Sequence, residues 1–82
     1  MNIYTGNLSR EVTEEDLRAA FKEYGEVSFV NIVKDRASKV SVGFGFVGMV
    51  EQGDGEAAVA GMNGKELKGK AIKVNEARPV SL

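Results

Sequence analysis

Residues 42–50, VGFGFVGMV, constrain the fold of this chain more than any other segment. Side chains along a β-strand point alternately to its two faces. Phe44 and Phe46 therefore share one face of a predicted strand. The other face takes the intervening residues Gly45, Val47 and Met49. The sequence thus predicts a strand that presents two phenylalanines side by side.

The amino-terminal part of the chain has the pattern of a strand followed by a helix. Residues 3–8 form a β-prone run that ends in a turn. Thr13 and Asp16 approximate a capping box, which marks the start of a helix. Gly25 is expected to end this helix in a left-handed conformation. The apolar face of the helix consists of Leu17, Ala20, Phe21 and Tyr24.

The rest of the chain predicts a second strand, a hairpin loop, a second helix and a last strand. In the second strand, the apolar residues Val27, Val30 and Ile32 interleave with Ser28, Phe29 and Asn31. Residues 34–41, KDRASKVS, form a polar, basic hairpin loop. A helix is expected at residues 54–62, with a frayed first turn because Gly53 and Gly55 each cost about 1 kcal/mol relative to alanine. A lysine-rich connection leads to a strand at residues 71–77.

The element order β, α, β, β, α, β predicts an α+β fold, the ferredoxin-like βαββαβ sandwich, in a single domain of residues 1–82. Both helices pack on one face of a four-stranded antiparallel sheet, and the other face stays open. On the open face the alternation places Tyr4, Asn31, Val33, Phe44, Phe46, Lys73 and Asn75. Exposed aromatic rings forgo hydrophobic stabilisation, so three rings lying bare and coplanar favour a ligand with flat faces.

Composition excludes most catalytic chemistry. The chain has no cysteine and no histidine, so it lacks thiolate nucleophiles, the commonest metal ligand and the commonest general base. We expect no enzyme activity, no cofactor and no metal. We also expect an intracellular, cytoplasmic protein with no membrane segment, because no apolar run is long enough to span a bilayer.

Charge is unevenly distributed along the chain. The net charge is −1, yet residues 34–49 carry three basic side chains against one acidic, and residues 64–82 carry five against two. The acidic residues lie mostly in the two helical stretches. A fold that turns helices to one side would therefore separate acidic from basic surface.

Two of these strands carry motifs that resemble the RNA-recognition motif family. Ile3-Tyr4-Thr5-Gly6-Asn7-Leu8 is similar to the motif of the family's first strand, and residues 42–49 are similar to the motif of its third strand. The likeness extends over essentially the whole chain. The compact length and the closing stretch VNEARP are similar to short single-domain bacterial members and to glycine-rich plant members. It implies a module that binds single-stranded RNA, and single-stranded DNA more weakly because 2′-hydroxyl contacts are lost.

The resemblance also assigns roles to individual positions. Tyr4 and Phe44 would each stack a base, and Phe46 would pack against a sugar or between nucleotides. The strand end at residues 75–78 would read base edges. The implied RNA-binding residues are Tyr4, Asn31, Lys34, Arg36, Lys39, Phe44, Phe46, Lys73, Asn75 and Arg78.

Three positions depart from the family pattern. Val42 stands where a basic residue is usual, so we expect weaker affinity and a weaker dependence on salt. Met49 replaces an aromatic core residue and Thr5 replaces an apolar one. Both are expected to lower stability rather than alter binding.

Other interpretations of the aromatic residues stay open at this point. The rings could be packed under a covering element or at a dimer interface, and the same fold could hold a partner protein, of which the sequence gives no identity. A small acyl phosphate hydrolase is a further alternative, although the sequence offers no nucleophile paired with a base. Glu14 and Glu15 are expected to be solvent-exposed helix residues without a chemical role.

Overall fold

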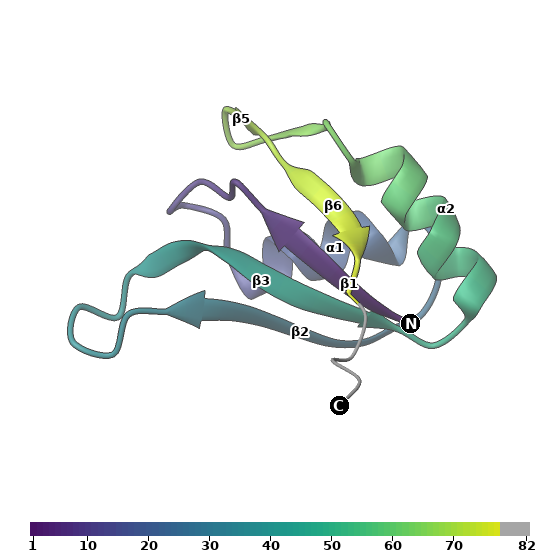
Figure 1. Ribbon diagram of the computed structural model, residues 1–82, viewed down its shortest axis with the longest axis horizontal. Helices are drawn as coiled ribbons and strands as arrows, with labels where there is room; N and C mark the ends of the chain where they lie inside the picture. Colours follow the sequence, from purple (N-terminus) through teal and green to yellow (C-terminus); the bar gives the residue numbers. More distant parts are fainter. Residues whose placement is uncertain (78–82) are drawn as a thin grey trace.

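The computed structural model describes residues 1–77, and these residues form one four-stranded antiparallel sheet, a two-stranded hairpin and two helices (Figure 1). In chain order the elements are β1 (Asn2–Gly6), α1 (Glu14–Lys22), β2 (Val27–Lys34), β3 (Ser41–Met49), α2 (Gln52–Met62), β4 (Glu66–Leu67), β5 (Lys70–Ala71) and β6 (Lys73–Glu76). The main sheet has the order β2-β3-β1-β6. The predicted ferredoxin-like arrangement is thereby confirmed.

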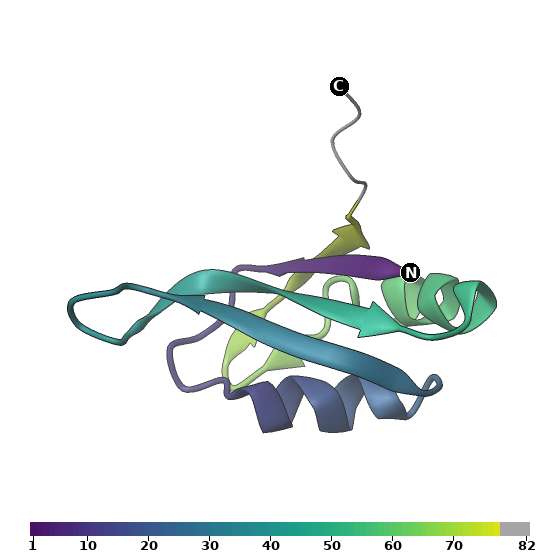
Figure 2. The same cartoon turned by 90° about the horizontal axis from the view of Figure 1, so that it is seen from below.

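The hydrophobic core lies between one face of the sheet and the two helices. Seen from the side, α1 lies against this face (Figure 2). The buried core residues are Ile3, Leu8, Val12, Leu17, Phe21, Ile32, Val47, Met49, Ala58, Met62, Ile72 and Val74. Met49 is well packed there. Thr5 is fully buried, but its hydroxyl donates a hydrogen bond of 3.1 Å to the carbonyl of Gly45, which offsets the cost of burying a polar group.

Helix α1 begins with the predicted capping box. The hydroxyl of Thr13 accepts a hydrogen bond of 3.1 Å from the backbone N–H of Asp16, whose carboxylate accepts one of 2.9 Å from the N–H of Thr13. The predicted left-handed stop at Gly25 is wrong, because the helix ends at Lys22 and Gly25 has a φ of 159°. Gly25 instead makes room for the side chain of Asp54, which a Cβ at this position would contact.

A bulge in β2 keeps its apolar residues on the core side. Val27 pairs with Met49 whereas Phe29 pairs with Gly48, so Ser28 is an extra residue that shifts the register. Val27, Val30 and Ile32 all pack in or against the core. The extra residue explains how Val27 and Val30, three positions apart, share a face with Ile32, two positions further on.

Helix α2 begins at Gln52, two residues before the predicted start. Its first turn is formed, contrary to the expected fraying, since the N–H of Gly55 donates to the carbonyl of Glu51 at 3.0 Å. Gly55 is buried against the side chain of Met1, which occupies the space a Cβ would need. Tertiary packing therefore outweighs the low helix propensity of glycine here.

Gly53, in contrast, is expected to be a weak point of α2 that can be improved. It is exposed, and a Cβ at this position would meet nothing within 4 Å. Gly53→Ala should raise the free energy of unfolding by about 0.5–1 kcal/mol, because alanine restricts the unfolded chain and favours the helix. Urea unfolding measures the change. A destabilised variant would contradict this assignment of the helix.

The predicted lysine-rich connection is a β-hairpin, β4–β5, and the last strand is shorter than predicted. Leu67 pairs with Lys70, and the two turn residues Lys68 and Gly69 have φ values of 50° and 90°. Positive φ at both central positions suits a two-residue hairpin, and glycine adopts it without strain. The strand predicted at residues 71–77 is limited to Lys73–Glu76.

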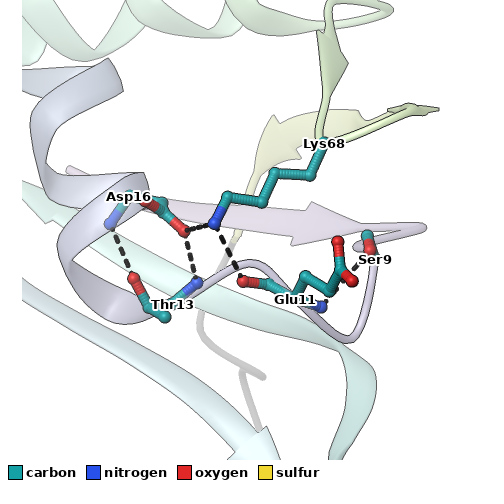
Figure 3. A network of polar contacts seen from close by, with 5 residues as sticks. All are labelled: Ser9, Glu11, Thr13, Asp16 and Lys68. Carbon is teal, nitrogen blue, oxygen red and sulfur yellow. Dashed lines mark hydrogen bonds and ion pairs between the residues drawn. The ribbon is translucent and has the colours of Figure 1, made fainter.

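Lys68 ties this hairpin to the start of α1 (Figure 3). Its ammonium group lies 3.1 Å from the carboxylate of Asp16 and donates to the carbonyl of Glu11 at 3.3 Å. The N–H of Glu11 in turn donates to the hydroxyl of Ser9 at 3.3 Å. The hydrogen bond from the backbone N–H of Thr13, together with Lys68, lowers the pKa of Asp16 from 3.8.

This network predicts a loss of stability in acid. Folding lowers the pKa of Asp16, so the ionised carboxylate stabilises the folded state. This stabilisation is complete well above pH 3.8 and is lost as the pH falls below that value. Asp16→Asn should therefore make the protein less stable at neutral pH and flatten the fall in stability below about pH 4. Urea unfolding measured from pH 7 to pH 2 provides the comparison. An unchanged pH profile would show that Asp16 makes no such contribution.

At each edge of the sheet, a side chain accepts a hydrogen bond from a backbone N–H of the edge strand. At the β2 edge, the carboxylate of Glu14 accepts a hydrogen bond of 3.1 Å from the N–H of Ile32. Glu14 and Glu15 are exposed, as predicted, but Glu14 thus has a structural contact. At the β6 edge, the side-chain carbonyl of Asn63 accepts a hydrogen bond of 3.0 Å from the N–H of Val74.

Neither of the two helices within residues 1–77 has the length and apolar composition of a membrane-spanning helix.

Candidate functional site

Three aromatic rings gather on the sheet face opposite the helices. Tyr4 in β1 pairs directly with Phe46 in β3, and Phe44 lies two residues earlier on the same strand. The ring centroids are 6.0 to 6.3 Å apart. All three side chains are partly exposed. No described helix or strand covers this face of the sheet (Figure 2). The structure thus brings together the three aromatic residues that the sequence placed on the open face.

The rings are not coplanar, which corrects one expectation. Tyr4 and Phe44 are stacked at 29° to one another, whereas Phe46 meets them edge-on, at 68° and 87°. Aromatic pairs prefer offset stacking or edge-to-face contact because of the quadrupole of each ring. The site therefore offers two rings of similar orientation and a third ring that stands across them.

Glycines beside the rings shape this face. A Cβ at Gly6 would lie within 3 Å of the ring of Tyr4, so this ring extends over the glycine. Gly45, between the two phenylalanines, has its missing Cβ aimed at the backbone of β2. There a Cβ would meet the carbonyl oxygen of Asn31 and lie 3.0 Å from the Cα of Ile32. Glycine at position 45 thus permits a close approach of β2 and β3.

Polar residues flank the rings on the outer strands. Asn31 in β2 pairs with Phe46, and Asn75 in β6 pairs with Tyr4. One cross-strand row therefore runs from Asn31 through the two rings to Asn75, and both amides are exposed. Lys73 is also exposed and pairs with Gly6. Amide groups can both donate and accept hydrogen bonds, so the row combines flat apolar surfaces with groups that can read polar edges.

The loop between β2 and β3 extends beyond the end of the sheet and carries Arg36 and Lys39, whereas Lys34 is the last residue of β2 (Figure 1). Asp35 folds the loop: its carboxylate accepts hydrogen bonds of 2.9 Å from the N–H groups of both Ser38 and Ala37. These bonds lower the pKa of Asp35 from 3.8. Within residues 1–77, the basic side chains of this loop form no ion pair. The exposed basic residues are Lys34, Arg36 and Lys39.

Arg78 lies outside the described residues. Val42, which stands where the family usually has a basic residue, is 49% exposed. It lines an open cleft together with Arg10 and Lys70. Gly43 next to it has a φ of 97°, in an irregular part of β3 where the register with β2 shifts.

Phe29 is an aromatic residue of the open face that the sequence reasoning did not include in the site. It is 40% exposed, and its ring occupies the space that a Cβ at Gly48 would need. The available signal was its position two residues before Asn31, which places both side chains on one face of β2.

Comparisons with known proteins agree on one family. The model of the RNA recognition motif matches residues 3–73. The "Putative RNA-binding protein RbpE" of Nostoc sp. (strain PCC 7120) is 46% identical over 79 residues, which cover 96% of this chain and 80% of that protein. The crystal structure of RNA Binding Protein PG1 is 40% identical, with a TM-score of 0.91 over 98% of this chain and 99% of that one. An Sxl-lethal protein/RNA complex is 29% identical, with a TM-score of 0.91, and the match covers 98% of this chain and 48% of that one.

Proposed function

This chain belongs to the RNA recognition motif family, and on that premise we propose that its open sheet face holds the unpaired bases bound by this single-stranded RNA-binding module. The observation that carries the proposal is the group of three partly exposed rings, 6.0 to 6.3 Å apart, on a face that no described element covers. Tyr4 and Phe44 each stack a base, and Phe46 packs against a sugar or between nucleotides. The protein acts by binding, without catalysis.

Residues on both sides of the rings hold the remainder of the ligand. The exposed side chains of Asn31, Lys73 and Asn75 hydrogen-bond to base edges or sugars next to the stacked bases. Arg78 is assigned to the same group from its place in the sequence. Discrimination against DNA comes from contacts to the 2′-hydroxyl, so single-stranded DNA binds more weakly.

The basic loop supplies the electrostatic part of the interaction. Lys34, Arg36 and Lys39 are exposed, and they lie at one end of the sheet, in the last residue of β2 and in the loop that follows it. The acidic first turn of α1, Glu14 to Asp16, lies on the helix side. This separation directs an anionic strand toward the open face in spite of the net charge of −1.

A salt titration tests the assignment of the loop. Replacing Lys34, Arg36 and Lys39 together by glutamine should reduce the slope of log affinity against log salt concentration by about 2, because each phosphate contact to a single strand contributes roughly 0.7. Lys22→Gln, in the last turn of α1, is the matched control and should leave the slope unchanged. An unchanged slope in the triple variant would remove these residues from the interface. If the affinity of the wild type hardly changed with salt concentration, phosphate contacts would be absent. That result would favour the alternative of an apolar protein partner.

A further inference from the structure

The open face continues beyond the three rings to a fourth aromatic side chain, Phe29. Phe29 pairs with Gly48 on β3, and Gly48 pairs with Asn2 on β1. This row is adjacent to the row that contains Phe46 and Tyr4. Because Val47 and Met49 on either side of Gly48 are buried in the core, position 48 faces the open side, and so does the ring that covers it.

The pairing of Phe29 with a glycine allows the ring to lie across the sheet. A Cβ at Gly48 would collide with the Cε1 and Cδ1 atoms of this ring, so any larger residue would displace it. Glycine within a strand weakens the strand unless it serves a close approach. The ring nevertheless remains 40% exposed, so covering the glycine uses only part of its surface.

The spacing from the other rings suits a continuous ligand. Two residues along a strand span about 6.7 Å, so the Phe29 row lies about that far from the Phe46 row. The three rings already described are separated by 6.0 to 6.3 Å. A base stacked on Phe29 would thus lie one row beyond the bases held by those rings.

The charges near Phe29 differ from those near the basic loop. The start of β2 follows Glu26, whose carbonyl accepts a hydrogen bond of 3.1 Å from the N–H of Val50, and Glu51 comes next in the chain. Arg18 reaches the carbonyl of Val27 from α1, on the helix side. The basic residues of the loop lie at the opposite end of β2. The ammonium group of Met1, at the same end of the sheet, already donates a hydrogen bond of 2.7 Å to the carbonyl of Met49. A nucleotide at Phe29 would consequently gain mainly stacking.

We propose that Phe29 is a further base-stacking position, which extends the RNA footprint by one unpaired base along β2, away from the basic loop. The inference rests on the proposed RNA-binding function of the open face. It differs from the contribution of the loop in a measurable way. Stacking on Phe29 adds affinity that does not respond to salt, whereas phosphate contacts respond steeply.

The test is a length series of oligouridylates from three to eight nucleotides, with affinity measured by fluorescence anisotropy at two salt concentrations. The wild type should gain about ten-fold in affinity at one added nucleotide, equally at both salts. Phe29→Leu, which keeps an apolar cover over Gly48 but has no aromatic face, should lose this gain and bind the shortest oligomers as the wild type does. Phe29→Trp should retain or increase the gain. Val50→Ala, an exposed apolar residue next to the same end of β3, is the control and should retain it.

Three results would overturn the proposal. Phe29→Leu could keep the full gain with length, it could weaken all oligomers equally together with a lower melting temperature, or the gain itself could depend on salt. Failure of the proposed function is a separate result, because the wild type would then bind none of the oligomers or bind them without need of Phe44 and Phe46. Phe29→Leu, by contrast, is expected to change only the gain in affinity that one added nucleotide brings.

Discussion

Replacing Phe44 and Phe46 together by alanine should abolish RNA binding while the protein stays folded. Loss of the base stacked on Phe44 should cost about 1–3 kcal/mol. Loss of the contact that Phe46 makes between nucleotides adds to this cost, so affinity should fall about 100-fold or more. Both side chains are partly exposed on the open face and lie outside the buried core, so their removal leaves the packing between sheet and helices in place. Fluorescence anisotropy with a short single-stranded RNA measures the loss, and circular dichroism measures the fold.

A matched control changes the same two positions but keeps their aromatic faces. Phe44→Tyr combined with Phe46→Tyr keeps both rings and should bind within a few-fold of the wild type, because the stacking surface is preserved. If the alanine double variant bound as tightly as the wild type, the open face would not be the RNA-binding surface. If both double variants lost binding equally, an aromatic face at these positions would not be sufficient for binding.

Gly45→Ala should destabilise the protein by about 2 kcal/mol or more, because overpacking of a close contact commonly costs 1–3 kcal/mol. The added Cβ would meet the carbonyl oxygen of Asn31 and the Cα of Ile32. Both belong to the backbone of β2, which cannot rotate away as a side chain can. The strand that carries Phe44 and Phe46 would then separate from β2. Urea unfolding gives the change in stability.

Gly53→Ala provides the comparison for this substitution. The same change in composition has the opposite expected sign there, since that position is open and helical. Equal stability of Gly45→Ala and wild type would show that β2 and β3 can move apart without cost.

The sequence allowed the sheet face and its three rings to be predicted because both depend on a period of two. Alternation is regular from Gly45 to Gly48, where β3 pairs with β1 from Thr5 back to Asn2. Phe44 lies just outside this stretch, where the register with β2 shifts, but its ring still contacts that of Phe46. The capping box at Thr13 was equally predictable, since it depends on residues three apart. Local patterns of this kind survive folding when tertiary packing agrees with them.

Features that depend on contacts between distant segments could not be predicted in this way. The role of Gly25 depends on Asp54 and the formed first turn of α2 depends on Met1, both far away in sequence. The strands of the β4–β5 hairpin have two residues each, too short to show any alternation. The bulge at Ser28 interrupts the alternation near Phe29, and the sequence does not show on which side of a bulge the extra residue falls.

The side-chain contacts at the two sheet edges limit the ways in which this protein can meet other molecules. Exposed edge strands commonly recruit an extended peptide or a second copy as an additional strand. Here the carboxylate of Glu14 accepts a hydrogen bond from the N–H of Ile32 on one edge. The side-chain carbonyl of Asn63 accepts one from the N–H of Val74 on the other edge. An incoming strand would have to displace these groups before it could pair. Strand addition is therefore disfavoured at one point on each edge, whereas the broad face of the sheet has no such obstacle among the described elements.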